Sequence, residues 1–298
     1  MNLKHIEGIS RAKINLHLAV LNRRDDGFHN ISSLMAGLDL ADRLTLREFK
    51  FFPGGNIDIS ISDSGGEYGS VTCGIETSSN LISIGAVNYL RKINTGGSLD
   101  FSIEKNIPSG AGLGGGSSNA ACAIELVRTA LGRSRDEACY SAAAETGSDV
   151  PFFLYGGFAF ASGRGEIIEP ISFSCDYHVI LVNNGIHVNT AQAYKSLGRD
   201  SLYSGPGHKE SAADITKCLG NLYKWKEVMK NDFEEAIFPL HPEIKMVKER
   251  LYELGADFAA MTGSGSTVFG IFSSYSRAKD ACNSLKKGNN AVLTKFAH

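Results

Sequence analysis

A glycine-rich run near the middle of the chain holds the residues best suited to do chemistry. Residues 108 to 118 read Pro-Ser-Gly-Ala-Gly-Leu-Gly-Gly-Gly-Ser-Ser, and a helical pattern begins directly after them. Glycines let the backbone approach a ligand closely, and the first N–H groups of a helix lie unpaired at the positive end of its dipole. The run therefore predicts an anion cradle for a phosphorylated ligand.

Two better-known phosphate loops do not match this run. A Walker A loop needs Lys-Ser or Lys-Thr after its last glycine, whereas Gly115 is followed by Gly116-Ser117. A dinucleotide fingerprint needs a strand that ends directly before the first glycine, but Pro108 and Ser109 intervene. A turn of small residues that only allows tight packing is the structural alternative.

Three other clusters contain residues that suit phosphate chemistry. Lys13 lies on the polar face of a predicted strand, where a solvated edge charge is the common explanation. Asp149 follows a predicted helix and precedes an apolar strand, a position typical of a turn residue that makes an Asx hydrogen bond. Residues 261–267 form a Gly/Ser loop, which is either a tight turn or a second backbone nest for anions.

Apolar periodicity predicts the elements that must position these clusters. Ile14, Leu16, Leu18 and Val20 alternate with other residues, which indicates a half-buried strand with Lys13, Asn15 and His17 on one face. Further strands are expected at residues 44–46, 57–61, 99–103, 152–154, 158–161, 179–182 and 268–272. Helices are expected at residues 82–93, 120–131, 136–146 and 244–254, and a mobile loop at residues 199–211.

Length and composition bound the class of protein. The 298 residues favour two domains, and a composition shift after Glu169 divides them into residues 1–169 and 170–298. A net charge of −2, from 30 basic and 32 acidic residues, argues against a nucleic-acid or membrane surface. Six scattered cysteines without a C-x-x-C pair, and the lack of a long apolar segment, predict buried thiols in a cytoplasmic protein.

Together the four clusters resemble the GHMP kinase family, named after galactokinase and the homoserine, mevalonate and phosphomevalonate kinases. Residues 108–118 resemble its central ATP-binding motif, and residues 261–269 resemble its C-terminal glycine motif. The resemblance spans about residues 10–272. It implies an α+β, two-domain GHMP kinase fold, with an N-terminal domain like domain 2 of ribosomal protein S5 and a ferredoxin-like C-terminal domain.

Within the family, four stretches resemble the members that phosphorylate a cytidine-diphosphate-linked branched polyol in the non-mevalonate isoprenoid pathway. They are residues 12–16, 24–29, 115–121 and 147–153. The implied reaction is ATP-dependent phosphorylation of the 2-hydroxyl of that small molecule, with Mg²⁺ as the expected ion. The implied protein is a monomer or a homodimer without a nucleic-acid or membrane partner.

The resemblance also implies a role for each site residue. Lys13 and Asp149 match the catalytic pair, in which Asp149 accepts the hydroxyl proton and Lys13 orients the hydroxyl and stabilises charge. Asn15, Phe28, His29 and Tyr194 match substrate-binding positions, although Phe28 replaces the family tyrosine. Ser118 is also a candidate contact for Mg²⁺. The implied ATP-binding residues are Asn80, Lys105, Pro108, Ser109, Gly110, Ala111, Gly112, Leu113, Gly114, Gly115, Gly116, Ser117 and Ser118.

Two alternative functions are left open by the sequence. The chain could be a GHMP kinase for another small alcohol, such as homoserine or mevalonate, but those substrates offer no base to stack on Phe28. It could also be a silent nucleotide-binding sensor, which would be expected to lack the Lys13 and Asp149 pair.

Overall fold

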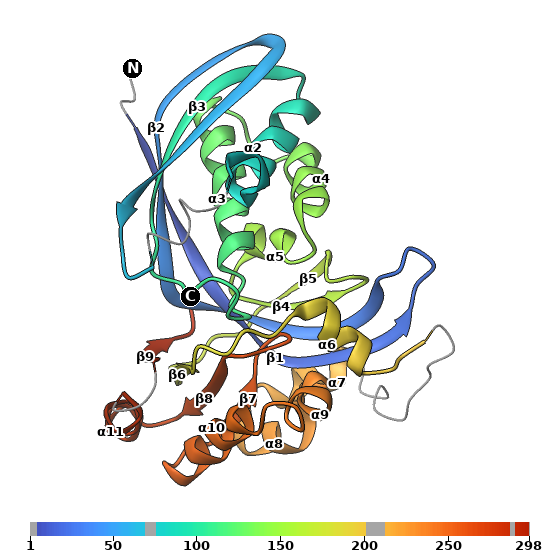
Figure 1. Cartoon of the computed structure of the whole chain (residues 1–298), viewed down its shortest axis with the longest axis vertical. Helices are drawn as coiled ribbons and strands as arrows, with labels where there is room; N and C mark the ends of the chain where they lie inside the picture. Colours follow the sequence, from blue (N-terminus) through green and yellow to red (C-terminus); the bar gives the residue numbers. More distant parts are fainter. Residues whose placement is uncertain (1–4, 69–75, 201–211, 287–289, 298) are drawn as a thin grey trace. The chain divides into compact units, whose positions relative to one another are not determined.

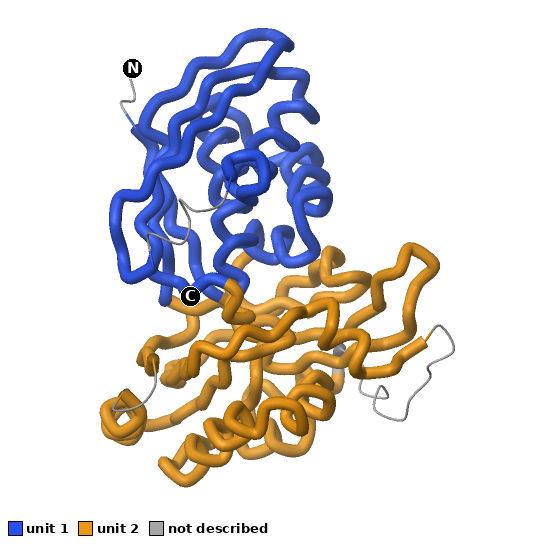
Figure 2. The backbone as a smooth tube through the Cα atoms, in the orientation of Figure 1, with its two compact units in different colours: residues 1–12, 40–109, 114–155 blue, residues 13–39, 110–113, 156–298 orange. Residues whose placement is uncertain are grey.

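The computed structural model describes residues 5–68, 76–200, 212–286 and 290–297, and the chain divides into two compact units. Unit 1 comprises residues 1–12, 40–109 and 114–155, and unit 2 comprises residues 13–39, 110–113 and 156–298 (Figure 2). Because the chain passes between the units more than once, both the first strand and the glycine-rich run contribute residues to each unit.

Unit 1 contains a sheet formed by the strands of the first hundred residues. β1 (Ile6–Arg23) and β2 (His29–Gly65) both begin or end outside this unit, and β3 (Thr95–Glu104) belongs to it entirely. β3 pairs with residues 43–54 and again with residues 57–65 of β2, so it lies between two limbs of one long strand. Phe101 therefore lies opposite both Leu46 and Ile61, which confirms the predicted alternation.

Helices of unit 1 bury their apolar faces together with this sheet (Figure 1). They are α2 (Leu81–Lys92), α3 (Gly115–Ala130), α4 (Glu137–Thr146) and α5 (Val150–Tyr155), whereas the short η1 (Thr77–Ser79) before α2 buries no residue. α2 packs on α3 and α4, and their contact buries Ala86, Tyr89 and Ile124. The helices predicted from the spacing of apolar residues are confirmed, including the stop of α3 before Gly132, whose φ is +66°.

One predicted strand of unit 1 is wrong. Residues 152–154 lie in the helix α5, so Asp149 directly precedes a helix and not a strand. Pro151 occupies the first turn, where the missing N–H costs nothing because it would be unpaired in any case. A short apolar run has too few residues to reveal its period, and this explains the error.

The C-terminal sheet of unit 2 has the strand order β7-β8-β6-β9, with every neighbouring pair antiparallel. Its strands are β6 (His178–Asn183), β7 (Phe258–Met261), β8 (Val268–Phe272) and β9 (Asn290–Lys295). α10 (Pro242–Glu253) and α11 (Tyr275–Leu285) pack on it. Helices before β7 and between β8 and β9 give the split βαβ arrangement of the expected ferredoxin-like fold.

The remaining elements of unit 2 lie between β2 and β7 in the chain. They are β4 (Phe158–Ser162), β5 (Ile167–Ile171), α6 (Thr190–Ser196), α7 (Ala212–Cys218), η3 (Leu222–Lys224), α8 (Trp225–Val228) and α9 (Phe233–Ile237). The predicted domain boundary after Glu169 falls inside β5, where Pro170 lies opposite Ala159 of β4. Pro170 is tolerated because β5 is at the edge of its sheet. The division after Glu169 stays a prediction.

β1 is buried on both faces from residue 12 to residue 20, so the prediction of a half-buried strand is wrong there. Lys13 is only 3% exposed, and Asn15 and His17 are equally buried. Their polar face is covered within unit 2, since the N–H of Lys230 donates to His17 Nδ1 and the N–H of Gly263 donates to Asn15 Oδ1. A solvated edge charge is therefore excluded for Lys13.

Other sequence expectations have mixed outcomes. Arg199, placed in the predicted mobile loop, is buried, and residues 201–211 of that loop lie outside the described residues. The cysteines at positions 122, 139, 175, 218 and 282 are free thiols; two of them, Cys175 and Cys218, are only partly buried, and Cys73 lies outside the described residues. Among the residues that the structure covers, no helix combines the length and apolar composition needed to cross a membrane.

Candidate active site

The glycine-rich run adopts a backbone that side chains rarely allow. Gly110, Gly112 and Gly114 have φ values of +68°, +78° and +70°, so left-handed residues alternate with ordinary ones along the run. Such alternation turns successive N–H groups toward one concave side, which is the geometry of a backbone nest for anions. Binding of an anion by this run stays a prediction, and the positive φ values are those that such a cradle requires.

In unit 2 the middle of this run meets two of the other predicted clusters. The N–H of Lys13 donates to the carbonyl of Leu113 at 3.0 Å. Gly112 approaches the turn after β7 so closely that a Cβ on it would lie 2.6 Å from the carbonyl oxygen of Thr262. The first and the last of these three segments lie more than two hundred residues apart in the sequence, and the fold brings all three together.

Asn15 joins the Lys13 ammonium to this turn. Its Oδ1 accepts a hydrogen bond from Lys13 Nζ at 2.7 Å and another from the N–H of Gly263 at 3.1 Å. Its Nδ2 donates to Ser33 Oγ at 2.8 Å, and Ser33 Oγ donates in turn to the carbonyl of His17. Because its amide is so fully engaged, Asn15 is placed to orient Lys13, in addition to its predicted role in substrate binding.

In unit 1 the end of the run starts α3. Gly114 is the N-cap, Ser118 donates its N–H to the Gly114 carbonyl at 2.9 Å, and the Ser118 side chain is buried in the first turn. A Cβ on Gly115 would lie 3.1 Å from Lys105 Nζ, so the lysine predicted to bind ATP lies beside the helix start. The N-terminus of a sixteen-residue helix favours negative charge here.

The Lys105 ammonium is engaged within unit 1. It donates to Asp42 Oδ2 at 2.5 Å and to the carbonyl of Ile107 at 2.6 Å, and both side chains of the ion pair are almost wholly buried. Burial lowers the pKa of Lys105, and the Asp42 carboxylate opposes that change. This pair braces the approach to the glycine-rich run, so a contribution of Lys105 to ATP binding stays a prediction.

Two further predicted residues belong to unit 1. Asn80 is the N-cap of α2 and accepts the N–H of Ile82 at 3.0 Å, which gives it a structural role beside its predicted place near the adenine. Asp149 is partly buried and directly precedes α5. Lys13 belongs to unit 2, so the pairing of Lys13 with Asp149 stays a prediction.

The residues predicted to bind the nucleobase all belong to unit 2. The His29 and Tyr194 rings stack with their centroids 5.1 Å apart, and His29 Nε2 lies 2.9 Å from the carbonyl oxygen of Arg199. Phe28 is 51% exposed, and the guanidinium of Arg164 lies 5.0 Å from its ring centroid. An exposed aromatic face next to an ordered imidazole suits a flat base. Tyr194 stacks on His29 in this structure, so its contact with the base stays a prediction.

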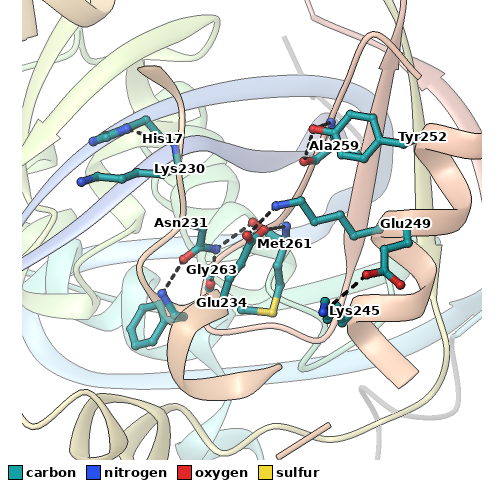
Figure 3. A network of polar contacts seen from close by, with 12 residues as sticks. His17, Lys230, Asn231, Glu234, Lys245, Glu249, Tyr252, Ala259, Met261 and Gly263 are labelled. Carbon is teal, nitrogen blue, oxygen red and sulfur yellow. Dashed lines mark hydrogen bonds and ion pairs between the residues drawn. The ribbon is translucent and has the colours of Figure 1, made fainter. Parts of the chain in front are cut away.

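A polar segment that sequence reasoning missed holds the turn after β7. Asn231 donates to the carbonyls of Met261 and Gly263, and Glu234 accepts the N–H of Met261 at 2.8 Å (Figure 3). The adjacent Asp232 accepts the N–H of Val20 at 2.9 Å and pairs with Arg199. Three hydrogen-bonding residues among the four at residues 231–234, where α9 begins, were the available signal, because buried polar groups need partners.

A divalent ion would bind here mainly through a phosphorylated ligand. The described residues contain no group of three His, Cys, Asp or Glu side chains that could hold a metal. Mg²⁺ usually keeps several waters and takes one or two protein ligands besides substrate phosphates, so it needs no such group. Ser118 at the start of α3 stays the predicted protein contact.

Comparisons with known proteins agree with this geometry. A family model of the GHMP kinases N terminal domain matches residues 80–157, and one of the GHMP kinases C terminal domain matches residues 212–291. The chain is 37% identical over 300 residues to a protein of Alkaliphilus metalliredigens named 4-diphosphocytidyl-2-C-methyl-D-erythritol kinase. That match covers 99% of this chain and 96% of the relative.

Solved structures give the same result for the fold. A crystal structure of 4-(cytidine 5'-diphospho)-2C-methyl-D-erythritol kinase matches with a TM-score of 0.76 and 31% identity, covering 98% of this chain and all of that one. A homoserine kinase from Cytophaga hutchinsonii matches with a TM-score of 0.75 over 99% of this chain and 96% of its own. At 16% identity, the second likeness concerns the fold alone.

Proposed function

Because this chain belongs to the GHMP kinase family, we propose that it phosphorylates the 2-hydroxyl of 4-diphosphocytidyl-2-C-methyl-D-erythritol with ATP in the non-mevalonate isoprenoid pathway. The products are the 2-phosphate and ADP. The observation that carries the proposal is the contact of Lys13 with the glycine-rich run, through Leu113, and with the turn at Gly263, through Asn15. A lysine whose backbone binds one glycine turn and whose ammonium is held at the other suits the transfer of a phosphoryl group.

The reaction requires one proton transfer and one phosphoryl transfer. Asp149 accepts the proton of the 2-hydroxyl, and the oxygen forms a bond to the γ-phosphorus as the bond from that phosphorus to the β,γ-bridging oxygen breaks. Lys13 offsets the charge that develops on the phosphoryl oxygens, which is the main task of a protein in this loose transition state. ADP leaves with the bridging oxygen.

Binding of ATP depends on backbone groups more than on side chains. The nest from Gly110 to Gly114 and the N-terminus of α3 offer N–H groups to the triphosphate. Ser118 is the proposed contact for Mg²⁺, which would supply positive charge to the phosphates of the nucleotide. Asn80 at the start of α2 is proposed to lie near the adenine, and Lys105 to brace the run.

Recognition of the second substrate falls to the aromatic residues of unit 2. Phe28 provides an exposed face on which cytosine stacks, and His29 is held by Arg199 so that it reads the edge of the base. Stacking of a base on an aromatic ring contributes about 1–3 kcal/mol in nucleic-acid sites. Homoserine and mevalonate carry no base, so they gain nothing from these residues.

An ADP-release assay with three acceptors tests this function. The chain is expected to use 4-diphosphocytidyl-2-C-methyl-D-erythritol far better than mevalonate or homoserine, as judged by kcat/KM. Equal or better use of either small alcohol would exclude the proposed substrate. ADP release without any acceptor dependence would instead indicate a nucleotide-binding protein that hydrolyses ATP only incidentally.

The proposal includes three properties of the working enzyme. It takes ATP together with Mg²⁺, it acts in the cytoplasm, and it is a monomer or a homodimer. Chelation of divalent ions with EDTA is expected to abolish turnover, and added Mg²⁺ is expected to restore it. Sedimentation velocity distinguishes one copy from two.

A further inference from the structure

We infer that Asn231 is a positioning residue that fixes the turn at Gly263 and, through Asn15, the ammonium of Lys13. The inference rests on the proposed function, since it assigns Lys13 to the phosphoryl transfer. Asn231, the turn at Gly263, Asn15 and Lys13 all belong to unit 2. Asn231 does not touch the reacting atoms and acts only through the backbone of the turn.

Asn231 is held rigidly beside β1. The N–H of Leu18 donates to the carbonyl of Lys230 at 2.8 Å, and the N–H of Asp232 donates to the carbonyl of Leu18 at 2.9 Å. Residue 231 therefore forms an isolated parallel β-bridge with Leu18 of β1. Only 4% of Asn231 is exposed, so its amide works in a site from which water is largely excluded.

All three hydrogen-bonding functions of the Asn231 side chain are used. Nδ2 donates to the carbonyl of Met261 at 2.7 Å and to that of Gly263 at 2.8 Å, and Oδ1 accepts the N–H of Phe233 at 3.0 Å (Figure 3). Only an amide offers two donors and an acceptor in this arrangement. The two carbonyls flank Thr262, so a single side chain fixes the backbone on both sides of that residue.

The same turn passes its position on to Lys13. The Gly263 residue is held at its carbonyl by Asn231 and at its N–H by Asn15 Oδ1, the atom that also accepts from Lys13 Nζ. Thr262 Oγ1 accepts the N–H of Asn15 at 3.0 Å. A change in the orientation of the turn therefore moves Asn15 and the ammonium together.

A second anchor shows that the position of the turn is set from the same segment. Glu234, three residues after Asn231, accepts the N–H of Met261 at 2.8 Å and pairs with Lys248 at 2.6 Å. The turn needs such anchors because it contains left-handed residues, with φ of +58° at Gly263 and +99° at Gly265. Glycine adopts positive and negative φ about equally readily, so contacts with side chains outside the turn are needed to fix one conformation.

Asn231→Asp is the sharpest variant because it keeps the acceptor for Phe233 and removes both donors. We expect kcat to fall about tenfold to a hundredfold, as for the loss of buried hydrogen bonds that orient a reacting group. KM for the cytidylated substrate should change by less than about threefold, because the variant keeps the acceptor for the N–H of Phe233, whose ring packs on Tyr194. Asn221→Asp is the matched control, since Asn221 caps η3 with its oxygen alone, and its kcat should equal that of the wild type.

A double-variant cycle with Asn15→Ala tests the route to Lys13. If Asn231 acts through Asn15, the double variant should lose no more kcat than the more impaired single variant, within about threefold. Multiplied losses would overturn the inference, and so would a wild-type kcat in Asn231→Asp. If Asn231→Asp does not fold, Asn231→Ala, which buries no charge, carries the same expectations. A wild-type enzyme without turnover would contradict the proposed function instead.

Discussion

The imidazole of His29 stacks on the phenol of Tyr194, with an interplanar angle of 21°. The carbonyl of Arg199 lies 2.9 Å from His29 Nε2, and a carbonyl can only accept, so Nε2 carries the proton. In the neutral ring this leaves Nδ1 as an acceptor, which suits the amino group of cytosine. Tyr194 therefore supports the residue that reads the base.

Truncation of the aromatic residues should weaken binding of the cytidylated substrate. We expect Phe28→Ala to raise its KM roughly 5-fold to 150-fold, which corresponds to about 1–3 kcal/mol of lost stacking. Tyr194→Ala should also raise this KM, because it removes the ring on which His29 stacks. KM for ATP should stay constant. Tyr223→Ala is the control, because Tyr223 is 87% exposed and distant in the sequence from these residues. An unchanged KM in both aromatic variants would rule out the stacking model.

Asp149→Asn should abolish most turnover and leave ATP binding intact. An amide has nearly the shape of the carboxylate but cannot accept the hydroxyl proton, and general-base catalysis contributes about 10²- to 10⁴-fold. Calorimetric titration with ATP and steady-state kinetics would measure the two effects. Turnover near that of the wild type would contradict the role of Asp149, and a parallel loss of ATP affinity would indicate a structural role.

Gly112→Ala should damage the ATP site. A Cβ at this position would lie 2.6 Å from the Thr262 carbonyl oxygen, so either the glycine-rich run or the turn must move. We expect a higher KM for ATP and at least a tenfold loss of kcat/KM. Gly132→Ala is matched, because Gly132 also has a positive φ of +66° but nothing lies within 4 Å of its Cβ position. It should cost about 1 kcal/mol of stability and no activity. Equal kinetics in the two variants would contradict the close approach.

Removal of the charge on Asp42 should destabilise the protein. Asp42 accepts from Lys105 Nζ and from the N–H groups of Asn106 and Ile107, and breaking such a buried pair costs about 3–5 kcal/mol. Urea unfolding of Asp42→Asn at pH 7 would measure the loss. Glu145→Gln breaks the exposed pair with Lys92 and should cost at most about 1 kcal/mol. Equal losses in the two variants would contradict the importance of burial.

The deficit of Asp42→Asn should also depend on pH. Burial already lowers the pKa of Lys105 in the folded wild type, and loss of Asp42 removes the charge that opposes this change. Between the folded and the unfolded pKa, the unfolded state binds more protons, so stability rises with pH. The deficit relative to the wild type should therefore shrink from pH 7 toward pH 10. A deficit that is constant over this range would show that Lys105 does not titrate in the variant.

Local patterns in the sequence predicted much of this fold and only part of its site. The alternation at Leu46 and Phe101 and the glycine after α3 follow from backbone geometry, which neighbouring residues determine. Residues 152–154 were assigned to the wrong element because a short buried helix and a short buried strand have the same composition. The composition shift at Pro170 coincides with an edge strand and not with the end of an element.

Long-range contacts account for what the sequence did not reveal. The burial of Lys13 depends on residues more than two hundred positions away, so its own neighbours indicated a surface charge. The role of Asn231 depends on its hydrogen bonds to backbone carbonyl groups of the turn after β7. Because every residue has a carbonyl group, residue types do not indicate which ones it binds. A polar residue that binds backbone atoms leaves no partner motif in the sequence, so only the structure reveals it.

Phosphorus NMR of the wild-type reaction tests the proposed function most directly. With ATP, Mg²⁺ and 4-diphosphocytidyl-2-C-methyl-D-erythritol, we predict one new phosphomonoester resonance, in an amount equal to the ADP formed, while the diphosphate resonances of the cytidylated substrate persist. Carbon couplings should place the new phosphate on the 2-hydroxyl. Absence of that resonance, under conditions in which a related kinase converts the same substrate, would contradict the function proposed for this protein.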